Sequence, residues 1–133
     1  GVELVGSVSR AQMVEELTSA EVLAYPCDPV RYTETFGSTV LEAMAAGCVP
    51  VLCLSDAFAE LWGPHCPGVP APYDGAQYAK LLAGVLNRHE AREGDARACR
   101  KAAEAYSWPV LGRRMSEFLE SRGERGFERP FSQ

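Results

Sequence analysis

Hydrophobic and polar positions follow two alternating periods along this chain. Short apolar runs at Val2–Val5, Val22–Tyr25 and Val49–Leu54 predict β-strands. The third run is continuous and follows a helical pattern, which is typical of a strand buried on both faces of a parallel sheet. A last short strand is expected near Val69–Ala71. Between these runs apolar residues recur every three or four positions, which predicts helices.

Local signals place the ends of the helices. Ser9 and Gln12 have the spacing of a capping box, so a helix should start there. Gly47 follows an apolar helical face and is a stop signal, and Asp74 should cap an amphipathic helix. Ser107 and the proline two residues later should open the last helix. The predicted helical segments begin near residues 9, 38, 57, 74, 90 and 107.

Alternating strands and helices predict an α/β fold with an open parallel sheet and helices on both faces. Ligands of such sheets bind at the carboxyl ends of the strands, where we expect the loops Cys27–Gly37 and Ser55–Gly68. We expect residues 1–121 to form one partial domain and residues 122–133 a flexible tail.

Composition excludes several classes of function. The chain has 133 residues and a net charge of -5, without a basic stripe, which argues against nucleic acid as a partner. No apolar run is long enough for an integral membrane segment. The five cysteines are an odd number with apolar neighbours, which favours buried free thiols in a reducing compartment. We therefore expect a cytoplasmic protein, able to act peripherally at a membrane.

The segment from Gly37 to Thr39 combines three features of a phosphate cradle. It leads directly into a helix, whose first N–H groups lack internal partners and favour an anion. Gly37 would let a ligand approach the backbone, and Ser38 and Thr39 add hydroxyl donors. Glu34 and Glu42 frame the cradle and suit the hydroxyls of sugars on either side of a diphosphate. No Asp-x-Asp occurs, which agrees with a site that needs no metal, and we expect no cofactor besides the donor substrate.

The block Glu34–Val51, with its two glutamates separated by seven residues and Phe-Gly between them, resembles the group 1 retaining glycosyltransferases of the GT-B fold. The matching segments cover nearly the whole chain. They include Leu4–Val8, Ala20–Pro26, Ala59–Leu61 and Tyr106–Trp108. The resemblance implies a Rossmann-like, donor-binding C-terminal domain, which is incomplete here, and a metal-independent hexosyltransferase in the full-length protein.

The resemblance also implies the roles of single residues. The catalytic carboxylate would be Glu34, which meets the transferred sugar of a UDP- or GDP-sugar. Glu42 would accept the ribose hydroxyls, and Val8 would lie against the base. The remaining donor-binding positions are Thr35, Phe36, Gly37, Ser38 and Thr39. The acceptor would be a sugar, a glycolipid or a small molecule.

Several alternatives remain open. Thr39 and Glu42 also have capping-box spacing, so Glu42 could be structural, and Ser38 or Thr39 could simply cap a helix. The family's basic diphosphate-binding residues and its second domain, which holds the acceptor, have no counterpart in this sequence. We therefore expect a fragment that is inactive alone. The alternatives are a non-catalytic nucleotide- or protein-binding module of the same fold, and a GT-B sugar-phosphate epimerase.

A chain that lacks part of its sheet and its partner domain should expose apolar surface and self-associate. We expect light scattering of the isolated chain to show a mass above that of a monomer, rising with concentration. A monodisperse monomer at high concentration would contradict this expectation.

Overall fold

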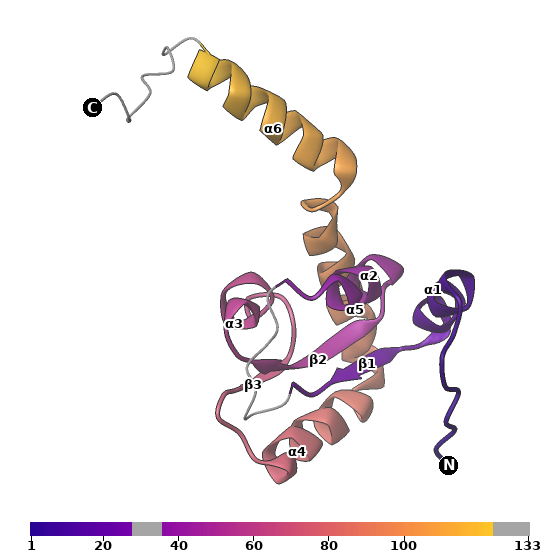
Figure 1. The fold of residues 1–133 in the computed structure, drawn as a ribbon. Helices are drawn as coiled ribbons and strands as arrows, with labels where there is room; N and C mark the ends of the chain where they lie inside the picture. The colour runs from indigo at the N-terminus through magenta and orange to yellow at the C-terminus, as the bar shows by residue number, and fades with distance from the viewer. Residues whose placement is uncertain (28–35, 124–133) are drawn as a thin grey trace. The chain divides into compact units, whose positions relative to one another are not determined.

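The computed structural model describes residues 1–27 and 36–123, which form helices and a parallel sheet (Figure 1). The chain divides into two compact units, Gly1–Ala103 and Glu104–Gln133. The elements are α1 (Arg10–Ser19), β1 (Val22–Tyr25), α2 (Ser38–Ala46), β2 (Val49–Leu54), α3 (Ala57–Leu61), β3 (Gly68–Pro70), α4 (Gly75–Leu86), α5 (His89–Glu104) and α6 (Trp108–Gly123).

The sheet is parallel, with the strand order β1-β2-β3. Val22 of β1 stands opposite Val49, and Leu52 of β2 stands opposite Gly68. The central strand is almost wholly buried, as its continuous apolar run predicts. Because all three strands run the same way, β1 and β2 both end at the edge of the sheet where α2 and α3 begin.

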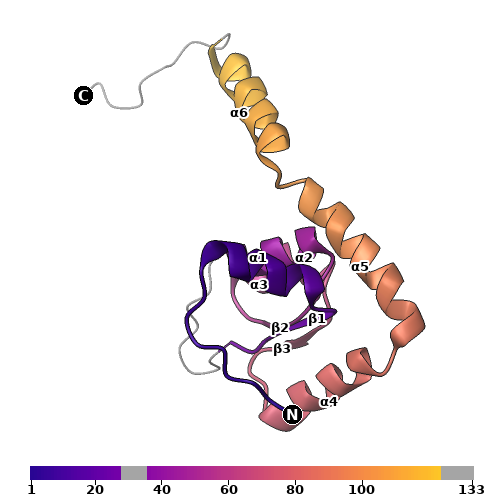
Figure 2. The same ribbon diagram turned by 90° about the vertical axis from the view of Figure 1, so that its right-hand side faces the viewer.

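Helices cover both faces of the sheet. Figure 2 shows α1, α2 and α3 on one side of the strands and α4 on the other. On the α4 side, Val49 and Val51 of β2 pack with Tyr78 and Val85. A second buried cluster joins the helices on the other side, and its members are Leu17, Ala43 and Cys48. The predicted α/β class, Rossmann-like with helices on both faces, is confirmed.

The predicted helix starts at Ser9 and Asp74 are confirmed by their capping hydrogen bonds. The Gln12 N–H donates to Ser9 Oγ at 3.3 Å, and the Ser9 N–H donates to Gln12 Oε1 at 2.9 Å. Asp74 accepts from the Gln77 N–H at 2.7 Å. Helix α6 begins at Trp108, directly after the expected start signal. These signals act within a few residues, which is why sequence alone locates them.

The predicted strand Val2–Val5 is wrong. Residues 2–5 have no strand structure, and Val2 and Leu4 are 93% and 94% exposed. A strand exists only through hydrogen bonds to a neighbouring strand, and residues 2–5 pair with no other described segment. Apolar alternation therefore indicates a strand-forming tendency here without the partner that would realise it.

All five cysteines are free thiols and are buried, which confirms that interpretation of their apolar neighbours. The apolar residues that predict one face of the last helix recur at helical spacing along α6, so this face is also present. Within the described residues this face is exposed, with Met115 at 59%, Phe118 at 52% and Leu119 at 59%.

Buried acids make the folded chain sensitive to alkali. Burial raises the pKa of Tyr78 to about 12, and burial together with the neighbouring Cys99 raises that of Cys48 to about 11. A raised pKa means that the folded chain holds the proton more tightly than the unfolded chain. The resulting stability is complete below the unfolded pKa and is lost as the pH rises through the folded one.

We therefore expect the free energy of unfolding to fall between pH 9 and pH 12, with Cys48 contributing between 9 and about 11 and Tyr78 between 10 and about 12. Tyr78→Phe should flatten the curve above pH 10, and Cys48→Ala should flatten it between 9 and about 11. Urea unfolding in steps of pH measures this. A Tyr78→Phe curve with the wild-type slope above pH 10 would contradict the assignment.

Candidate functional site

Helix α2 begins at the carboxyl edge of the sheet without a side-chain cap. Its N-cap is Gly37, in the left-handed conformation with φ 70° and ψ 63°. The first helical hydrogen bond runs from the Leu41 N–H to the Gly37 carbonyl at 3.1 Å. Among the described residues, the N–H groups of Gly37, Ser38 and Thr39 donate to no acceptor. These donors and the positive end of the helix dipole favour an anion at this point.

The structural interpretation of Thr39 and Glu42 is wrong. A capping box needs its hydroxyl at the N-cap, but the N-cap is Gly37, and Thr39 is the second residue of α2. Ser38 likewise lies inside the helix instead of capping it. Glu42 therefore has no role in starting the helix, and its position one turn inside α2 needs another explanation.

Glu42 has an ionic partner that sequence reasoning missed. Its Oε1 lies 2.8 Å from Arg10 Nη2, and the two side chains are 32% and 74% exposed respectively. Arg10 is the first residue of α1, so the Ser9 capping box fixes the position from which it reaches α2. A pair this exposed contributes little to stability and exchanges readily. Glu42 is thus held near the start of α2 by an exposed ionic contact.

Helix α3 supports the segment that leads into α2. The Trp62 Nε1–H donates to the Phe36 carbonyl at 2.7 Å, and the two rings meet edge to face at 5.5 Å. A Cβ added to Gly37 would lie 2.5 Å from the ring of Phe58. The sequence suggested glycine for the approach of a ligand. The structure adds that α3 leaves no room for a side chain at this position.

The other predicted site residues are divided by the limits of the described chain. Glu34 and Thr35 lie outside the described residues, so the catalytic role of Glu34 stays a prediction. Val8 is half-buried directly before the N-cap Ser9 of α1. Arg10 follows two residues later and contacts Glu42 of α2. Val8 therefore lies in the segment of chain that reaches α2 through Arg10.

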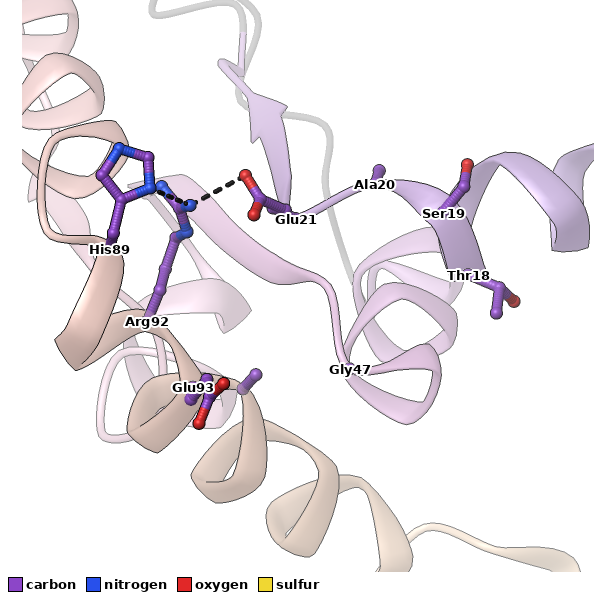
Figure 3. A pocket seen from close by; sticks show the side chains of 9 residues that line it. Thr18, Ser19, Ala20, Glu21, Gly47, His89, Arg92 and Glu93 are labelled. Atoms are coloured by element: carbon purple, nitrogen blue, oxygen red, sulfur yellow. Dashed lines mark hydrogen bonds and ion pairs between the residues drawn. The ribbon is translucent and has the colours of Figure 1, made fainter.

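A cavity of about 310 Å³ lies at the opposite edge of the sheet, around the amino end of β1 (Figure 3). Arg92 is buried beside it, and three groups contact its guanidinium. Its guanidinium donates to Glu21 Oε2 at 2.8 Å and to the Leu86 carbonyl at 2.6 Å, and it contacts His89 Nδ1 at 2.8 Å. These bonds tie α4 and α5 to β1, which is a structural task. None of the predicted site residues lines this cavity.

No cluster of three or more His, Cys, Asp or Glu side chains within residues 1–27 and 36–123 has the arrangement of a metal site. In the same residues, every helix is too short or too polar to cross a bilayer.

Comparison with known proteins places this site in a family context. The family model described as "Glycosyl transferases group 1" matches residues 1–105. The chain is similar to a phosphatidyl-myo-inositol mannosyltransferase of Mycolicibacterium smegmatis, at 29% identity over 121 residues, 90% of this chain and 31% of the relative. Proteins of the same name from Mycobacterium tuberculosis and Mycobacterium leprae are 30% and 31% identical, over 90% of this chain and 32% of each relative.

The chain thus spans about a third of the length of these relatives. The matched part contains α1, α2 and α3, which together form the described site.

Gly37→Ala should destabilise the protein. A residue with a Cβ in the left-handed region costs about 1 kcal/mol or more, and the Phe58 ring must also move. We expect the free energy of unfolding to fall by about 2 kcal/mol, measured by urea denaturation. Gly84→Ala is the matched control, because open space surrounds this helical glycine, and it should gain about 0.5–1 kcal/mol. Equal effects of the two substitutions would contradict the proposed constraint.

Proposed function

The chain belongs to the group 1 glycosyl transferases, and we propose that it forms the donor-binding part of an enzyme that transfers a sugar from a nucleotide-diphospho-sugar to an acceptor. One observation carries the proposal. At the start of α2, no described residue accepts from the N–H groups of Gly37, Ser38 and Thr39, which lie at the carboxyl edge of the sheet with the carboxylate of Glu42 one turn away. This is the edge at which open α/β sheets bind their ligands.

The two ends of the donor need opposite chemistry. The diphosphate needs hydrogen-bond donors, which the backbone of Gly37, Ser38 and Thr39 supplies together with the helix dipole. The ribose needs an acceptor, which is the role of Glu42, about 6 Å further along the helix axis. Arg10 beside Glu42 adds a positive charge to a cradle that has no lysine of its own.

The transferred sugar is assigned to the segment before the cradle. Glu34 is the proposed catalytic residue, and Thr35 and Phe36 complete the donor contacts. In the proposed reaction the bond between the anomeric carbon and the diphosphate oxygen breaks, and the acceptor hydroxyl attacks that carbon from the same face and gives its proton to the leaving diphosphate, so the configuration is retained. The leaving diphosphate is stabilised by the amides of α2 instead of a metal ion, which agrees with the absence of Asp-x-Asp from the sequence.

The names of the relatives suggest which substrates to test first. Those proteins are named as mannosyltransferases acting on phosphatidyl-myo-inositol. We propose a hexosyl donor, with GDP-mannose and UDP-glucose as the two probes, and an acceptor that is a sugar, a glycolipid or a small molecule. A glycolipid acceptor would fit a cytoplasmic enzyme that acts at a membrane surface. Since the described chain covers a third of the relatives, we propose that it is inactive alone.

Calorimetric titration of the full-length protein with each donor tests the site. Glu42→Ala should weaken donor binding by about tenfold, since it removes a charged acceptor of two ribose hydroxyls. Glu34→Ala should lower kcat by more than it lowers donor affinity, since its role is at the transferred sugar. EDTA should leave turnover unchanged.

Glu60→Ala is the matched control, because Glu60 is an exposed carboxylate on α3 outside the proposed contacts. It should bind and turn over the donor like the wild type. Wild-type affinity and turnover in both Glu42→Ala and Glu34→Ala would overturn the site assignment. A full-length protein that binds neither donor would overturn the proposed function itself.

A further inference from the structure

Trp62 makes an unusual connection for a core residue. Its side chain is fully buried, yet its single polar group points at the backbone of the cradle instead of at its own helix. The Nε1–H donates to the Phe36 carbonyl at 2.7 Å, a short and therefore well-formed bond. A buried indole N–H needs a partner, and here that partner belongs to a segment 26 residues away in sequence.

The hydrogen bond from Trp62 also fixes the direction of the Gly37 N–H. The Phe36 carbonyl and the Gly37 N–H belong to one peptide unit, which is planar and trans, so they point in opposite directions. Because Trp62 holds the oxygen toward α3, the Gly37 N–H faces away from α3. Among the described residues no acceptor takes this N–H.

A second contact prevents the peptide from turning over. The ring of Phe58 lies where a side chain of Gly37 would be, and it also packs against Tyr25 at the end of β1, with ring centroids 6.0 Å apart. Phe58 on α3 and Trp62, the C-cap residue of α3, are both fully buried. The ring of Phe58 and the hydrogen-bonded carbonyl of Phe36 together hold Gly37 at its positive φ.

We propose that Trp62 is a positioning residue for donor binding, which fixes the Phe36–Gly37 peptide so that the Gly37 N–H points at the donor diphosphate. This inference rests on the proposed function. It gives α3 a role that the glutamate motif does not contain, because α3 aims a backbone donor of α2 without touching the ligand. Donors that are already fixed in position bind a negative charge more strongly than donors that must first reorient. This holds for charge present in the ground state and for charge that develops in the transition state.

The test replaces the indole N–H in the full-length protein. Trp62→Phe removes the donor and keeps an aromatic ring. Replacement of Trp62 by 3-benzothienyl-alanine removes only the N–H and keeps both fused rings, so it serves if the smaller ring impairs folding. We expect each replacement to raise KM and the calorimetric Kd for the nucleotide sugar by about tenfold and to change kcat less than twofold. The reason is that the Gly37 N–H, which Trp62 positions, binds the diphosphate in the ground and transition states alike.

Tyr78→Phe is the matched control. It also removes one buried donor to a backbone carbonyl, the 2.8 Å bond from the Tyr78 hydroxyl to the Val51 carbonyl, but on the opposite face of the sheet. It should lower Tm by an amount similar to that of the Trp62 variants and leave donor affinity within about twofold of the wild type.

Each outcome decides between the proposals. If the wild type binds the donor and a folded 3-benzothienyl-alanine variant binds it equally well, the positioning role is overturned while the proposed function stands. If Tyr78→Phe weakens donor binding as much as the Trp62 variants do, the effect is general loosening and the role is again overturned. If the wild type binds no nucleotide sugar, the proposed function fails before Trp62 is tested.

Discussion

The pairing of β2 on both of its edges is the constraint from which the first unit is built. Val49–Leu54 lies between β1 and β3, and apolar side chains cover both of its faces. Its residues Val49–Leu52 pair with β1 and Leu52–Leu54 pair with β3, so neighbours on both edges and both faces fix its position. Helix α2 leads into it and α3 leads out of it. The amides of the cradle and the aromatic support beneath them are therefore attached to the two ends of one fixed strand.

Sequence reasoning located the elements whose signals are local. The apolar run of β2, the capping pair Ser9 and Gln12, and the cap Asp74 each act over a few neighbours, and the structure contains all of them. It failed at Val2–Val5, where the apolar pattern is the same but the pairing strand is absent from the described chain. A strand forms only when a second strand pairs with it. The apolar pattern of one segment therefore cannot establish that a strand forms there.

The candidate site divides in the same way. The family and the region of the cradle follow from the segment around Gly37 and Glu42, since spacing along one chain carries that information, and the family is confirmed. The contacts of Arg10 with Glu42 and of Trp62 with Phe36 join residues 26 or more positions apart and depend on how α1 and α3 dock against α2. No periodicity encodes such docking. The role of Glu34 stays a prediction, because this residue lies outside the described part.

The two glycines that bound α2 also limit how this sequence can drift. Gly37 opens the helix and Gly47 closes it, each with a positive φ, and the Cys48 N–H completes the end by donating to the Ala43 carbonyl. Inserting one residue between them would turn the rest of the helix by about 100°. Glu42 would leave its side of the cradle, or the buried face would leave the core. Point substitutions can therefore accumulate on the exposed side of α2, whereas its length is closed to evolutionary change.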